Sequence, residues 1–145
     1  MSFTQEECCL AIEAATNIIN QRTENTTSFT WGYNDCANLL IEYDRSLRQG
    51  ITKADLPFEW SGTKDFLVKL KKHGYSMQQY IEHCGYKIVN TQKPQIGDVS
   101  FEGGCTIAGP DGWISITESN QGVRVHRQMM FLERRLIFLA RPEKG

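Results

Sequence analysis

The sequence predicts an α+β domain, with helices in the first half of the chain and a small antiparallel sheet in the second. Apolar residues recur at helical spacing up to about residue 84, whereas after Gly85 the pattern changes to short apolar runs separated by turn residues. A chain of 145 residues is the size of one ordinary domain. We therefore predict a single domain over 1–145, with a helical part at about 1–84 packed on a sheet part at about 85–142.

The first helix is predicted over 4–20. Thr4 and Glu7 have the spacing of a capping box, in which each side chain bonds to the other's backbone N–H. The apolar residues that follow at helical spacing are Cys8, Ile12, Ala15 and Ile19. The stretch at 21–28 is rich in Asn, Thr and Ser, so we expect a loop there.

Three further helices are expected before Gly85. The second begins near Cys36 and stops near Gly50, because Gly is common just beyond helix ends. Its apolar stripe comprises Ala37, Leu40, Ile41 and Leu47. Two shorter helices are predicted over 62–73 and 76–84.

Six strands are predicted in the second half. They lie at 86–89, 98–101, 105–108, 113–118, 123–127 and 136–140. Residues that tolerate tight reversals separate them, namely Gly103-Gly104, Pro110-Asp111-Gly112 and Asn120-Gln121-Gly122.

The composition excludes several classes of protein. Sixteen Lys and Arg against seventeen Asp and Glu give a net charge of −1, which is not that of a nucleic-acid binder. The sequence has no apolar run long enough to span a bilayer, and Glu6 and Glu7 stand where a signal peptide would be basic. Five irregularly spaced cysteines fit neither a disulfide framework nor a zinc site. We expect synthesis in a reducing cytoplasm, at least one free thiol, no metal and no cofactor.

The segment around Cys36 carries the clearest chemical signal. Cys36 follows an aromatic, Gly-containing loop at the predicted start of a helix, where partial positive charge and unpaired N–H groups favour a thiolate and hold an oxyanion. Cys36 is therefore a candidate nucleophile. In the alternative interpretation Cys36 is a small buried apolar side chain and Asp35 only caps the helix.

The motifs here resemble a known family. Trp31-Gly32, Asp35-Cys36 and the later Gly97-Asp98-Val99 are similar in order and separation to the WGxxDC and GDV motifs of NlpC-type papain-like cell-wall peptidases, and in particular to a small phage-encoded branch of that group. The resemblance runs from about Phe29 to Pro142. It implies a papain-like fold, Cys36 as nucleophile, and Asp98 at a structural turn.

The resemblance fails at the catalytic histidine. The family has a histidine at the start of the strand after GDV, whereas this chain has no histidine between Phe101 and Ala108. Neither Cys105 nor Thr106 is an adequate substitute for imidazole near pH 7. The expected dyad is broken.

Three histidines occur elsewhere. His73 ends a predicted helix and suits its C-terminal dipole, and His83 lies beside Cys84, where adjacent helical side chains diverge. His126 is on a predicted strand, on the face opposite Val123 and Val125, so solvent exposure is the alternative to a catalytic role. His126 is the best candidate for the missing base.

Other candidate site residues follow from the same plan. Glu118, near Ser115, would orient the histidine, although a solvent-facing position explains it equally well. A peptide or glycan groove would be lined by Trp31, Tyr33, Asp35 and Trp113, with Trp60 as a further aromatic candidate, and core packing is the alternative for the aromatic residues.

The sequence leaves three functions open. The first is a phage virion or tail-associated hydrolase that cleaves peptidoglycan peptides through Cys36, as a cysteine peptidase or amidase. The second is a non-catalytic structural or adaptor component of a phage particle, whose partners are other phage structural proteins. The third is a small thiol protein, which only the cysteine count favours. For the first two we expect host-cytoplasmic synthesis followed by incorporation into the virion.

Overall fold

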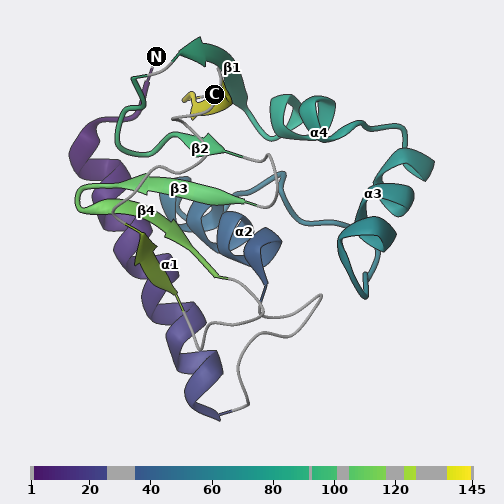
Figure 1. The fold of residues 1–145 in the computed structure, drawn as a ribbon, viewed down its shortest axis with the longest axis horizontal. Coiled ribbons are helices and arrows are strands. Elements are labelled where there is room, and N and C mark those ends of the chain that lie inside the picture. Colours follow the sequence, from purple (N-terminus) through teal and green to yellow (C-terminus); the bar gives the residue numbers. More distant parts are fainter. Residues whose placement is uncertain are drawn as a thin grey trace.

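The protein has one six-stranded antiparallel sheet, with the two N-terminal helices against it and two shorter helices to one side (Figure 1). The computed structural model describes residues 2–25, 35–91, 93–100, 105–116, 123–126 and 137–144. The helices are α1 (Gln5–Asn25), α2 (Cys36–Leu47), α3 (Thr63–Lys72) and α4 (Met77–His83). The strands are β1 (Tyr86–Thr91), β2 (Val99–Ser100), β3 (Thr106–Gly109), β4 (Gly112–Ser115), β5 (Arg124–His126) and β6 (Ile137–Pro142). The predicted α+β class is confirmed.

The strands lie in the order β1-β6-β2-β3-β4-β5, and every neighbouring pair is antiparallel. All six strands fall where the sequence predicts them, with ends that differ by a few residues. β3 and β4 form a hairpin at Pro110-Asp111, as the turn residues predict. The other two predicted turns, 103–104 and 120–122, lie outside the described residues.

α1 begins with the predicted capping box. The Thr4 N–H donates to Glu7 Oε1 at 2.9 Å, and the Glu7 N–H donates to Thr4 Oγ1 at 3.1 Å. The loop expected at 21–28 is wrong over 21–25, which continue the helix. Gln, Arg and Glu in that stretch are good helix formers, and Asn20, just before it, anchors the helix to the sheet by accepting from the Val123 N–H at 2.9 Å.

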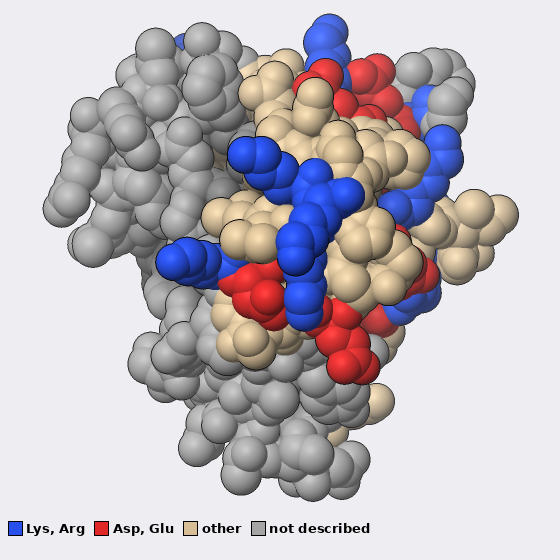
Figure 2. Space-filling view, turned by 90° about the vertical axis from the view of Figure 1, so that its right-hand side faces the viewer, with Lys and Arg blue, Asp and Glu red and all other residues tan. Residues whose placement is uncertain are grey.

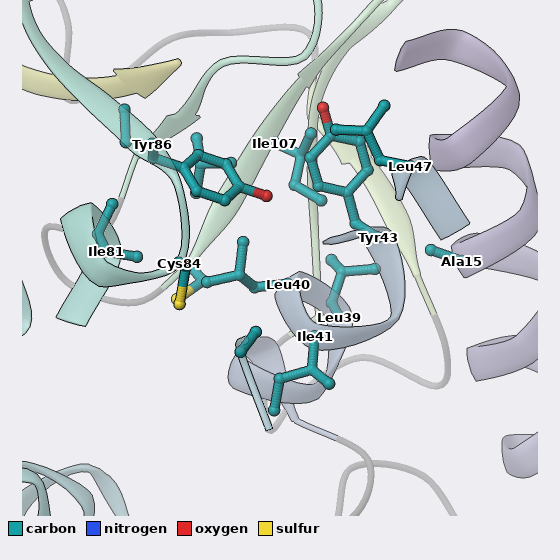
Figure 3. Close-up of a cluster of buried hydrophobic side chains, with 14 of the residues drawn as sticks. Ala15, Leu39, Leu40, Ile41, Tyr43, Leu47, Ile81, Cys84, Tyr86 and Ile107 are labelled. Atoms are coloured by element: carbon teal, nitrogen blue, oxygen red, sulfur yellow. The ribbon is translucent and has the colours of Figure 1, made fainter. Parts of the chain in front are cut away.

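α2 is the central helix of the domain. It packs against α1 on one side and β3 on another, and it buries residues on several faces (Figure 3). These are Leu39, Leu40, Ile41, Glu42, Tyr43, Asp44 and Leu47. The helix ends before the predicted stop, because Gln49 and Gly50 both have positive φ and reverse the chain.

The sheet has two apolar faces. In register across it, Ala140, Val99, Ile107 and Ile114 belong to the core shared with the helices. The alternate positions Leu139, Ala108 and Trp113 form a second buried cluster with Val89. Because side chains alternate between faces, this second cluster lies on the face away from α1 and α2.

The α3 side of the molecule carries charges of both signs. Lys71 and Lys72 at the end of α3 are exposed. Figure 2 shows Lys and Arg side chains next to Asp and Glu on this side rather than a surface of one sign. Ser2 bridges to Glu143, which brings the two ends of the chain together (Figure 1).

Candidate functional site: a thiol pair at the start of α2

Asp35 fixes the point at which α2 begins. Its Oδ1 accepts from both the backbone N–H and the side-chain amide of Asn38, each at 2.9 Å, and its Oδ2 accepts from the indole N–H of Trp60 at 2.7 Å. The residue has no exposed surface. Asp35 is therefore an N-cap whose two carboxylate oxygens are held inside the protein. Nothing in this arrangement turns the carboxylate towards a substrate.

Cys36 is the first residue of α2, as the sequence predicts. Its side chain is partly exposed and packs at the margin of the main core. Next to it is Cys105, which immediately precedes β3 and is only 4% exposed. Cys105 is the group that acts most strongly on the pKa of Cys36, and Cys36 acts in turn on the pKa of Cys105. Residues far apart in the sequence are thus brought together where the helix starts and the hairpin strand begins.

The surroundings of Cys36 favour its thiolate. The neighbouring Cys105 thiol lowers the pKa of Cys36 to about 7, although burial acts in the opposite direction. The backbone amides of Cys105 and of Cys36 itself lower the pKa further, and the charge of Asp35 raises it. The pKa of Cys105 is raised by the Cys36 thiol and by burial, so Cys36 is the cysteine of the two that ionises more readily.

The residue opposite Cys105 is apolar. Ile107 is paired with Ile114, so continuation of the β3–β4 register by two residues places Cys105 opposite Ile116. Ile116 is 1% exposed and belongs to the core. Because the pKa of Cys105 is raised, its thiol does not shuttle protons near neutral pH.

Two of the three histidines, His73 and His83, pack against aromatic rings of their own region. His73 Nδ1 donates to the Lys69 carbonyl at 2.9 Å, and its ring packs 5.0 Å from that of Phe58. The His83 ring packs 5.1 Å from that of Tyr75. Neither histidine is among the groups that shift the pKa of Cys36. His73 therefore has the helix-end position expected from the sequence.

His126 is described through its backbone in β5. Its Cα is in register with that of Trp113, whose side chain is 1% exposed and packs on the sheet face away from α2. Val125 is in register with Ile114, on the helix side of the sheet. The register thus gives no support to a pairing of His126 with Cys36, and the catalytic role of His126 stays a prediction.

The remaining predicted site residues that the structure describes are largely buried. Trp113 is buried, Ser115 is 4% exposed, and Trp60 is 8% exposed, with its ring packed edge-on against Phe66 at 5.1 Å. Trp31, Tyr33 and Glu118 lie outside the described residues. For Trp113 and Trp60, core packing is the environment observed.

Two features of this region are not evident from local sequence patterns. For Cys105, the position after Gly97-Asp98-Val99 is the signal in the sequence that indicates proximity to Cys36. The bond from Trp60 to Asp35 had no signal in the sequence, because it joins a loop to a helix cap.

Asp98 has the structural role that the motif implies. It is completely buried, accepts from Nε and Nη2 of Arg141 at 2.9 and 3.0 Å, and accepts from the Gln95 N–H at 2.8 Å. The preceding Gly97 has a φ of 97°, and its carbonyl accepts from the Tyr43 hydroxyl at 2.9 Å. This turn ties β2 to β6 and to α2.

A separate pocket of about 790 Å³ lies near the chain ends. Its lining includes Phe3, Arg48, Tyr86 and Lys144. The Arg48 guanidinium is already bonded to the Asp44 carboxylate and to the carbonyls of Gly85 and Glu143. The pocket does not include either member of the thiol pair.

Within the described part of the chain, no cluster of three or more His, Cys, Asp or Glu side chains has the arrangement of a metal site. Across the same residues, no helix has both the length and the apolar character needed to cross a membrane. Comparisons with protein-family models, with curated proteins and with solved structures found no match to this chain.

Proposed function

We propose that the chain is a papain-like domain that no longer hydrolyses peptides and serves as a structural or adaptor component of a phage particle. The WGYNDC segment and Gly97-Asp98-Val99 support the kinship with the phage-encoded NlpC-type branch. One observation carries the loss of hydrolysis. Cys105, whose thiol pKa is raised, lies just before β3, where the family would place the catalytic histidine, and it acts on the Cys36 thiol.

The chemistry of peptide hydrolysis explains why this observation matters. A cysteine peptidase needs a group that accepts a proton during attack and returns it to the leaving amine. Cys105 has a raised pKa and remains a thiol at neutral pH, so it performs neither step. The neighbouring strand position, Ile116, supplies no polar atom to orient an imidazole.

Retention of the fold without the chemistry is consistent with a role in protein contacts. The buried Asp35–Trp60 hydrogen bond and the Asp98–Arg141 ion pair maintain the two motif segments as structural elements. The near-neutral net charge favours protein partners over nucleic acid. Other proteins of the particle are therefore the proposed partners.

The first test is hydrolysis of purified peptidoglycan. The wild-type chain and a C36A variant, both shown to be folded by circular dichroism, are incubated with the substrate, and released amino groups are counted against an active cell-wall hydrolase. We expect both proteins to match the buffer blank. Release by the wild type that disappears in C36A would establish the hydrolase alternative instead.

The second test concerns the particle. We expect the chain to be present in purified virions of the phage that encodes it, in a fixed ratio to the major structural proteins. Particle yield and infectivity should be unchanged by C36A. Absence of the chain from intact particles would contradict a structural role.

A further inference from the structure

The pocket near the chain ends is a part of the molecule that the proposed function does not use. Its volume of about 790 Å³ is within the range of small-molecule sites, which is roughly 300–1,000 Å³. The lining comes from both ends of the chain, from the segment after α2 and from the junction of α4 with β1 (Figure 1). Phe3, Ile51 and Tyr86 supply its apolar surface. Ile51 is 80% exposed, so a ligand that covered it would remove apolar area from water.

Arg48 brings a fixed cation to this pocket. Its Nε donates to Asp44 Oδ1 at 2.9 Å, and its Nη1 and Nη2 donate to the carbonyls of Glu143 and Gly85 at 2.9 and 3.2 Å. The side chain is 15% exposed. A guanidinium has five N–H groups, so these three bonds leave two without a partner among the residues that the structure describes. Arg48 lines the pocket, and its remaining donors suit a carboxylate.

The other charged side chains of the lining have both signs. Lys53 supplies a positive charge, and Glu82 and Glu143 supply two negative charges. Within the described part of the chain, none of these three side chains forms an ion pair, whereas Lys144 is paired with Glu7 at 3.2 Å. The pocket therefore offers groups for an anion and for a cation. Two carboxylates would repel a phosphate or polyphosphate, so a zwitterion fits this lining better.

We propose that this pocket binds a small zwitterion with an apolar side chain, of the kind that a short peptide with free termini provides. The carboxylate of the ligand pairs with Arg48 and Lys53. Its ammonium group pairs with Glu82 and Glu143, and its apolar side chain packs on Ile51. This inference goes beyond the proposed function, because the pocket includes neither member of the thiol pair.

The test is a nuclear magnetic resonance titration of the full chain, in which backbone amide shifts report both the affinity and the place of binding. The probe is the dipeptide leucyl-leucine. N-acetyl-leucyl-leucine lacks the ammonium group, and leucyl-leucine amide lacks the carboxylate. We expect the dipeptide to bind with a Kd of about 1 mM or tighter and to shift the amides of Ile51 and Gly85. Each blocked form should bind roughly fivefold more weakly, because one set of ionic contacts is lost.

Matched variants separate the two charged sides of the pocket. K53M should weaken binding of the dipeptide and of its N-acetyl form but leave binding of the amide unchanged. E82Q should weaken binding of the dipeptide and of the amide but leave that of the N-acetyl form unchanged. Both side chains are exposed, so neither change should disturb the fold. K71M, on the exposed side of α3, is the control and should bind all three probes as the wild type does.

Three results would overturn the site. The first is the absence of saturable shifts at about ten times the expected Kd, in protein that circular dichroism shows to be folded. The second is a set of shifts that maps outside the pocket. The third is equal affinity for the dipeptide and both blocked forms. Neither the peptidoglycan assay nor the analysis of particles involves this pocket, so failure of this inference is distinguishable from failure of the proposed function.

Discussion

The indole N–H of Trp60 donates a 2.7 Å hydrogen bond to Oδ2 of Asp35, the residue that immediately precedes Cys36. Both partners are buried, with exposed fractions of 8% and 0%. The bond joins the segment between α2 and α3 to the first turn of α2. The position of the Cys36 sulfur therefore depends on a structural carboxylate rather than on a catalytic one.

Replacement of Asp35 by alanine should destabilise the protein by about 2–4 kcal/mol, because it removes a helix cap and leaves the Trp60 N–H buried without its acceptor. Urea denaturation followed by circular dichroism measures the change. The exposed Glu13 on α1 offers a matched control, since E13A removes a carboxylate from a helix surface and should cost less than about 0.5 kcal/mol. Equal effects of the two substitutions would refute the capping role.

Alanine substitutions at Gly97 and Gly50 distinguish the effect of backbone strain from that of a steric clash. Both have φ near 95°, but a Cβ at Gly97 would lie 2.5 Å from Cys8 Sγ and 2.8 Å from Cys8 Cβ, whereas a Cβ at Gly50 meets nothing within 4 Å. G97A should therefore cost about 1–3 kcal/mol more than G50A in the free energy of unfolding. Equal losses in a denaturation experiment would show that α1 does not pack against the Gly97 turn.

The Asp98–Arg141 ion pair should contribute more to the free energy of unfolding than the ion pairs on the surface. The Asp98 side chain is 1% exposed, so R141M leaves a buried charge without its partner and should cost about 3 kcal/mol. K144M removes the exposed Lys144–Glu7 pair and should cost at most about 1 kcal/mol. Thermal or chemical denaturation of the two variants compares them directly, and a milder effect of R141M would contradict the burial of this pair.

Most of the fold follows from local patterns in the sequence. The Thr4 and Glu7 spacing, the apolar period of the helices and the Pro110-Asp111 turn act over a few residues, and each is present in the structure. The composition of 21–25 favours a loop, but these residues belong to α1. A hydrogen bond from the Val123 N–H to Asn20 holds the preceding turn of the helix, and local sequence does not reveal it. Strand order was beyond prediction, since β1 and β2 both pair with the distant β6.

The candidate site was only half predictable. A cysteine after Asp35 at a helix start is a local signal, and the structure places Cys36 there. For Cys105 the signal in the sequence is its position after Gly97-Asp98-Val99, which does not show how the β3–β4 hairpin packs against α2. The paired carboxylate of Asp35 and the buried ring of Trp113 were expected to face a groove, but hydrogen bonding and packing hold them inside the protein.

The pH dependence of Cys36 alkylation is the most direct test of the thiol pair. Iodoacetamide reacts with the thiolate, so the rate at Cys36, followed by peptide mass spectrometry, should rise with a midpoint at about pH 7 in the wild type, while Cys84 stays nearly unreactive. In C105A the Cys36 midpoint should move up towards the ordinary thiol value of about 8.5, because the donor that lowers the pKa is gone. The same midpoint in both proteins would contradict the influence of Cys105 on the Cys36 thiol.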